Sequence, residues 1–137
     1  MTKEQLIIMA KEAMKQAYSP YSGYKVGAAL LCKDGTVYTG CNVENAGFSA
    51  TNCAERTAFF KAVSEGKREF VSIAICGGKE GVTEELFPPC GVCRQVMREF
   101  CEDDFEIYLL AAEGIETYTL GQLLPTSFRP ENITRKR

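Results

Sequence analysis

The pattern of hydrophobic and polar positions divides the chain into segments with helical and strand periodicity. Apolar residues recur at helical spacing from Leu6 to Ala17, directly after a Thr2–Gln5 pair with capping-box spacing. Two further helices are predicted, at Asn52–Glu65, with Asn52 as the N-cap, and at Cys90–Glu102. Apolar segments rich in β-favouring residues predict strands over Val26–Cys32, Thr36–Cys41, Phe70–Cys76, Phe105–Ala112 and Ile115–Thr119.

The order of these elements predicts the fold class. A Lys33-Asp34-Gly35 turn joins the first two strands into a hairpin, and the later strands alternate with helices. Such an order requires one mixed sheet covered on both faces. We find no internal repeat or linker that divides the chain, so we expect residues 1–137 to form a single three-layer α/β/α domain with a mixed five-stranded sheet.

Composition narrows the chemistry. The 137 residues include no histidine, which excludes imidazole bases, histidine-ligated metals and Ser-His or Cys-His pairs. The 16 Lys and Arg residues do not outnumber the 18 Asp and Glu residues, which does not favour binding to nucleic acid. Catalytic acid and base work therefore falls to carboxylates, and metal binding to thiolates.

The chain shows no sign of a membrane or secretory segment. Its N-terminal residues lack the apolar core of a signal peptide, and no apolar run approaches the roughly 20 residues of a spanning helix. We therefore expect a cytoplasmic protein with no membrane partner. In that reducing compartment, 7 cysteines indicate thiols or metal ligands rather than a disulfide framework.

Three cysteines have spacing that suits one metal ion. Cys90 and Cys93 share a face at the start of a predicted helix, although a lone CxxC also fits a redox pair or incidental core thiols. Cys53 lies in the first turn of another predicted helix, and helix N-termini stabilise thiolates. Three thiolates leave the fourth tetrahedral position of Zn²⁺ open, as in a catalytic site.

Two charged residues follow Cys53 closely. Glu55, at i+2, does not share its face and is not expected to be a co-ligand, but it can reach a metal-bound water. Arg56, at i+3, shares the face and can balance the charge of the thiolates. Alternatives remain open: Glu55 can form a capping box with Asn52, and Arg56 can be a solvated charge. A fourth ligand would make the zinc structural, and it would come from the cysteines predicted in the core, Cys32, Cys41, Cys76 and Cys101.

At this point a family resemblance emerges. Cys-Ala-Glu-Arg at 53–56 and Pro-Cys-Gly-Val-Cys at 89–93 resemble the zinc deaminases of nucleosides and nucleobases. The resemblance narrows to the small homotetrameric cytidine deaminases and covers nearly the whole chain. It is carried further by the segments 24–30, Asn42-Val-Glu-Asn45, Cys93-Arg-Gln95 and Leu-Leu-Pro at 123–125.

The resemblance implies roles for the residues that match the zinc motif and the sugar site. Cys53, Cys90 and Cys93 would bind one Zn²⁺ per subunit, with Glu55 as the proton shuttle. Asn42 and Glu44 match positions that hold the ribose 3′-hydroxyl, and strand alternation places both on one side. The backbone of Ala54 would contact the base.

Aromatic residues match the family's base pocket less closely. Tyr24 stands at the position of a family Phe that lines this pocket, and Phe48 at that of an aromatic contributed by a neighbouring subunit. Phe128 resembles a C-terminal aromatic that reaches a neighbour's base site, although a hydrophobic anchor for the tail is the simpler interpretation. The loop from Gly78 to Pro88 is longer than usual and receives no role, and the basic end at 135–137 is expected to be solvated.

By resemblance, the chain is a hydrolase that deaminates cytidine and 2′-deoxycytidine to uridine and 2′-deoxyuridine, releasing ammonia in pyrimidine salvage. Its partners would be a nucleoside substrate and further copies of the chain, in a homotetramer with active sites near the subunit interfaces. One alternative is a deaminase of another amino-pyrimidine or of an antibiotic nucleoside. The others are a non-catalytic four-cysteine zinc module and, with less support, a nucleic-acid editing enzyme.

Overall fold

A single mixed sheet forms the centre of the computed structural model, which describes residues 1–134; the basic end at 135–137 lies outside the described residues. The strand order is β2-β1-β3-β4-β5, with β3 and β4 parallel and the other neighbours antiparallel. The predicted mixed five-stranded sheet is therefore confirmed. Its strands are β1 (Tyr24–Cys32), β2 (Val37–Cys41), β3 (Phe70–Lys79), β4 (Glu106–Ala111) and β5 (Gly114–Thr119).

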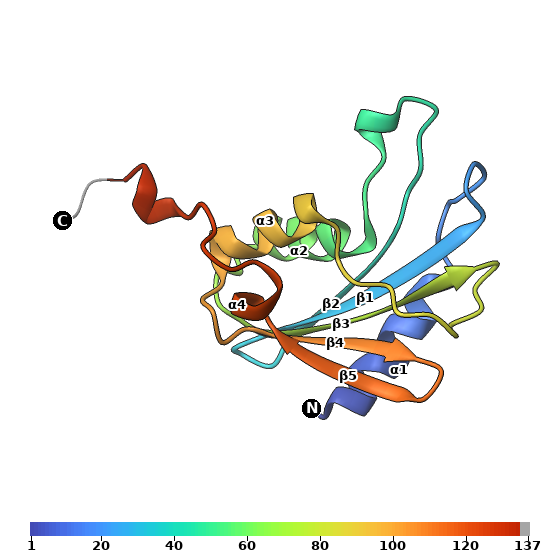
Figure 1. Ribbon diagram of the computed structural model, residues 1–137, viewed down its shortest axis with the longest axis horizontal. Coiled ribbons are helices and arrows are strands. Elements are labelled where there is room, and N and C mark those ends of the chain that lie inside the picture. The colour runs from blue at the N-terminus through green and yellow to red at the C-terminus, as the bar shows by residue number, and fades with distance from the viewer. Residues whose placement is uncertain (135–137) are drawn as a thin grey trace.

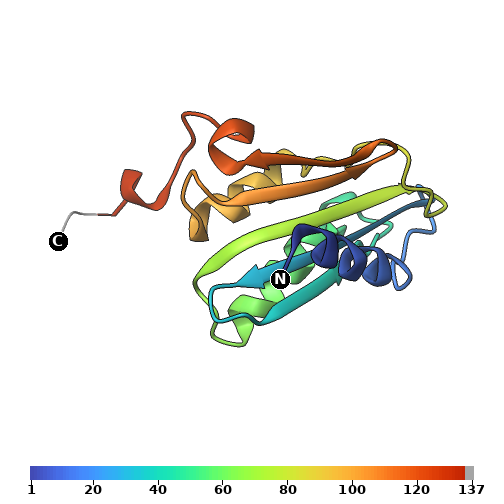
Figure 2. The ribbon, with the colours of Figure 1, turned by 90° about the horizontal axis from the view of Figure 1, so that it is seen from below.

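Helices cover both faces of this sheet. Helix α1 (Lys3–Met14) lies on one face, while α2 (Ala54–Ser64) and α3 (Gly91–Phe100) lie side by side on the other (Figures 1 and 2). The predicted three layers are thus present. Short helices η1 (Phe48–Ala50), α4 (Leu120–Leu123) and η2 (Pro130–Asn132) complete the described chain. None of the helices within residues 1–134 is long and apolar enough to cross a membrane.

The central strands β1 and β3 are buried on both faces, which explains their nearly continuous apolar sequences. Toward α1, the side chains of Ala29 and Ala74 pack with Leu6 and Ala10 of the helix. Toward α2 and α3, the core centres on Phe59, which is fully buried. The rings around it are those of Phe70, Phe100 and Phe105.

The three main helices begin in different ways. Helix α1 has the predicted capping box, in which Thr2 Oγ1 accepts from Gln5 N–H and Gln5 Oε1 accepts from Thr2 N–H. By contrast, cysteines occupy the N-cap positions of α2 and α3, and neither thiol bonds a helix N–H. The prediction of Asn52 as an N-cap is wrong. Its backbone pairs with Val43 instead, at N···O distances of 2.9 Å in both directions.

The third strand is longer than the sequence pattern predicted. It continues past Cys76 to Lys79, because Gly77, Gly78 and Lys79 pair with the first residues of β1. This extension places the end of β3 beside the first residues of β1. It also sets the starting point of the long loop that follows.

A glycine in β1 lets α1 approach the sheet closely. A Cβ atom on Gly27 would lie 2.0 Å from Ala10 O and 2.8 Å from Met14 N, both in the helix backbone. We therefore expect Gly27→Ala to lower the free energy of unfolding by about 1–3 kcal/mol, measured by urea denaturation. As a control, Gly47→Ala should stay within about 0.5 kcal/mol of the wild type, because its Cβ would meet only Asn45 Oδ1, at 3.4 Å. Equal stability of all three proteins would contradict the close packing of α1.

Candidate active site

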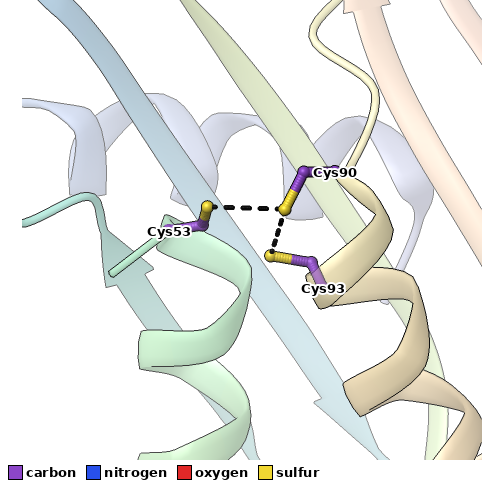
Figure 3. A group of neighbouring side chains, drawn as sticks. All are labelled: Cys53, Cys90 and Cys93. Atoms are coloured by element: carbon purple, nitrogen blue, oxygen red, sulfur yellow. Dashed lines mark hydrogen bonds between the residues drawn. The ribbon is translucent and has the colours of Figure 1, made fainter. Parts of the chain in front are cut away.

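Three thiols meet where α2 and α3 begin. Cys53 and Cys90 are the N-cap residues of the two helices, and Cys93 lies in the first turn of α3. Their sulfur atoms all lie within 4.8 Å of one another, with Cys53 Sγ 3.8 Å and Cys93 Sγ 3.5 Å from Cys90 Sγ (Figure 3). In residues 1–134 this is the single group of three or more Cys, Asp or Glu side chains close enough to hold a metal ion.

The donor chemistry of this group fits Zn²⁺. Thiolates are preferred zinc ligands, and three of them leave a fourth tetrahedral position open. Both N-cap sulfurs are free of bonds to helix N–H groups, so their lone pairs remain available. None of the other cysteines in the described chain joins the group: Cys32, Cys76 and Cys101 are buried in the core, and Cys41 is half-buried. A four-cysteine site therefore has no support from the geometry.

Arg56 brings positive charge to the thiols. Its Nη2 donates a hydrogen bond to Cys53 Sγ at 3.3 Å, one helical turn from the N-cap. Hydrogen bonds from the Cys93 thiol, from Arg56 and from the Cys90 thiol lower the pKa of Cys53 to about 5. The hydrogen bond to Cys53 and burial raise the pKa of Cys93. These hydrogen bonds favour the thiolate form of Cys53.

Glu55 lies beside the thiols but outside their group. Its side chain is 4 % exposed, and this burial raises the pKa of the carboxyl group to about 7. At that value the carboxyl group can both take up and release a proton near neutral pH. The N-terminal turn of α2 therefore carries a thiol at Cys53, a carboxyl group that can exchange a proton at Glu55, and a guanidinium at Arg56.

A cavity of about 260 Å³ opens next to Cys53, Cys90 and Glu55. It is lined by most of the residues that sequence analysis singled out. They reach it from four places: the start of β1, the segment after β2, the first turn of α2 and the start of α3. Those residues are Tyr24, Asn42, Glu44, Cys53, Ala54, Glu55 and Cys90.

The polar side chains of Asn42 and Glu44 are fixed in the cavity by hydrogen bonds to β1 and to the loop before it. Asn42 Oδ1 accepts from Val26 N–H at 2.9 Å, and Asn42 Nδ2 donates to Tyr24 O at 2.8 Å. The carboxylate of Glu44 accepts hydrogen bonds from the hydroxyl and N–H of Ser22 and from the N–H of Tyr21, and the Ser22 hydroxyl bond chiefly lowers its pKa. Each side chain keeps spare bonding capacity in a fixed direction.

Two of the aromatic residues do not line this cavity. Phe48 is 88 % exposed on η1, at the tip of a segment that stands away from the helices (Figure 1). Phe128 is 58 % exposed, and its carbonyl accepts from Gln95 Nε2 at 2.9 Å. Neither ring therefore contributes to the cavity of its own chain.

Several lining residues were missed by the sequence analysis, among them Ser22, Thr51 and Phe87. Phe87, from the loop to which no role was assigned, contributes its side chain to the cavity together with Pro88. The signal that points to it is an aromatic residue three positions before Cys90, in the run Phe-Pro-Pro-Cys.

Known proteins match this chain over most of its length. Residues 1–109 match the family described as "Cytidine and deoxycytidylate deaminase zinc-binding region". A cytidine deaminase of Sporosarcina psychrophila is 51% identical over 135 residues, covering 98% of this chain and 96% of that protein. A cytidine deaminase of Halalkalibacterium halodurans is 49% identical over 134 residues, covering 97% of this chain and 98% of that protein.

A solved structure shares the fold as well. The crystal structure of cytidine deaminase from Burkholderia pseudomallei superposes with a TM-score of 0.86 at 46% identity, covering 93% of this chain and 100% of that chain. The family model covers residues 1–109, and relatives match nearly the whole chain, so the chain belongs to the cytidine deaminase family.

Proposed function

We propose that this chain is a hydrolase that deaminates cytidine and 2′-deoxycytidine to uridine and 2′-deoxyuridine, with release of ammonia, as a step of pyrimidine salvage. The observation that carries this proposal is the buried Glu55 carboxyl group in a cavity directly beside a three-thiol group. The named activity of the relatives that match nearly the whole chain supports it.

In this proposal Cys53, Cys90 and Cys93 hold one Zn²⁺ per chain. When bound, the ion supplies a Lewis acid that makes a water nucleophilic near neutral pH. Three thiolates would leave a zinc site with net negative charge, which opposes that ionisation. Arg56, in contact with Cys53 Sγ, and the N-terminal ends of α2 and α3 offset this charge.

Glu55 moves the protons. Its carboxylate takes a proton from the attacking water and delivers it to N3 of the pyrimidine, which makes C4 electrophilic. It then carries a proton to the departing amino group, so that water and cytidine give uridine and ammonia. Burial and the pKa of about 7 fit a group that acts as base and acid in turn.

The remaining cavity residues bind the nucleoside. The ionised Glu44 and the amide of Asn42 would hydrogen-bond the ribose 3′-hydroxyl, the backbone of Ala54 would contact the base, and the ring of Tyr24 would line the base pocket. Their common placement around one cavity supports these roles. An intact sugar is therefore part of the proposed substrate, which favours nucleosides over free bases.

We also propose that Phe48 and Phe128 act at a neighbouring subunit's site in a homotetramer. Both rings are more than half exposed and neither lines the cavity of its own chain. The cytoplasmic location expected from the sequence stays a prediction.

Replacing Glu55 separates proton transfer from metal binding. We expect Glu55→Gln to retain zinc but to lower kcat by about 10²–10⁴-fold, because the amide cannot shuttle a proton. Absorbance assays of cytidine loss and metal analysis of the same samples check both points. Glu99→Gln, on the exposed side of α3, is the matched control and should keep wild-type activity. Near-normal turnover by Glu55→Gln would overturn the assignment.

Metal content tests the ligand set. We expect the purified protein to hold about one zinc per chain, and Cys90→Ser to lose most of it, since a hydroxyl is a much weaker zinc ligand than a thiolate. Cys41→Ser alters a half-buried thiol outside the group and should retain zinc. Atomic absorption on the dialysed proteins gives the ratio. Zinc retained by Cys90→Ser and lost from Cys41→Ser would refute the ligand set.

The charge of Arg56 should appear in the pH profile. We expect Arg56→Gln to shift the rising limb of kcat to higher pH by about one unit, since a hydrogen bond to a charged group is worth about 1.5–3 kcal/mol. The sign follows because removing a positive charge raises the pKa of the ionisation that generates the nucleophile. Arg56→Lys keeps the charge and should shift the profile less. An unmoved profile for Arg56→Gln would remove the charge-balancing role.

A further inference from the structure

The long loop after β3 folds back over the end of its own strand. Val82 N–H bonds Lys79 O at 3.0 Å, and a Cβ on Gly78 would lie 1.6 Å from Val82 O. The turn itself uses positive φ angles at Glu80 and Gly81. Because a side chain at position 78 would collide with the backbone, glycine is required for this return path.

The same return path seats the ring of Phe87. A Cβ on Gly77 would lie 3.2 Å from Phe87 Cδ2, tighter than ordinary contact, so the ring rests against the bare backbone of β3. The half-buried ring of Phe87 also packs on Tyr24, with centroids 5.6 Å apart and planes inclined by 36°. Lys79 Nζ lies 5.6 Å from the centroid of the Tyr24 ring. The two rings are therefore fixed from several sides, and we call them the aromatic wall.

The aromatic wall gives the cavity a flat apolar surface in addition to its polar groups. Among the lining residues of the described chain, Tyr24 and Phe87 are the aromatic ones. The proposed sugar contacts come from Asn42 and Glu44, and the reacting edge of the base would meet Glu55 and the thiols. The faces of a pyrimidine ring then still require an apolar surface, which the wall provides.

We propose that Phe87 is a specificity-determining residue whose ring packs against the pyrimidine base of the substrate. This inference rests on the proposed function and adds to it a residue from the long loop. Stacking on an aromatic ring recognises the base and is indifferent to the sugar. The contribution of Phe87 is therefore equal for cytidine and 2′-deoxycytidine. Because Phe87 takes no part in proton transfer, its contact is the same in the bound substrate and in the transition state, and it acts on KM rather than on kcat.

The test compares Phe87→Leu, which keeps apolar bulk but removes the ring, with Phe87→Tyr, which keeps the ring. Leu86→Ala is the matched control, because Leu86 belongs to the same loop but does not line the cavity. Steady-state kinetics give KM and kcat for both nucleosides, and calorimetry gives the Kd of uridine, which does not react. For Phe87→Leu we expect KM for both nucleosides and the Kd of uridine to rise roughly tenfold, with kcat within about twofold.

Phe87→Tyr and Leu86→Ala should stay within about threefold of wild-type KM. Unchanged KM and Kd in Phe87→Leu would overturn the role of Phe87, as would a loss confined to kcat or a rise for one nucleoside alone. If the wild type binds uridine but does not deaminate cytidine, the proposed function fails while uridine binding still decides the role of Phe87. A wild type that neither binds nor deaminates pyrimidine nucleosides would overturn both.

Discussion

The site depends on one constraint, the meeting of two helix N-termini on the same face of the sheet. Cys53 and Cys90 occupy N-cap positions without bonding a helix N–H, and Cys93 adds a third sulfur within 4.8 Å. Cysteine at these positions stabilises the helices less than Ser or Asp would, because its thiol does not accept a hydrogen bond from a helix N–H. The arrangement also crowds groups that repel one another once ionised. A bound cation would relieve this repulsion, so the crowding of the thiols and their chemistry have a common cause.

The first turn of α2 then distributes the chemistry by helical geometry alone. Residues at i+2 face away from one another and residues at i+3 share a face. Glu55 is therefore not a co-ligand of Cys53 but lines the cavity beside it, where burial raises its pKa, while Arg56 contacts Cys53 Sγ. The first turn of α2 alone thus supplies both the group that carries protons, Glu55, and the group that balances charge, Arg56.

Features that depend on local sequence could be predicted, and those that depend on distant pairing could not. Periodicity and the Thr2 capping box identified α1 and the strands, and two short cysteine motifs identified the thiol group. The prediction of Asn52 as an N-cap was wrong because the backbone of Asn52 pairs with that of Val43. The extension of β3 to Lys79 depends on pairing with β1. Phe87 was missed because its contact with Gly77 forms only after the loop folds back, and the Phe-Pro-Pro-Cys run does not by itself predict that contact.

The central claim is that three sulfurs bind one zinc ion and leave a fourth position open. X-ray absorption at the zinc edge of the purified native protein measures this directly, since it distinguishes sulfur from lighter ligands. The account predicts three sulfur ligands and one oxygen or nitrogen ligand. Four sulfur ligands, or a native protein without zinc, would contradict it.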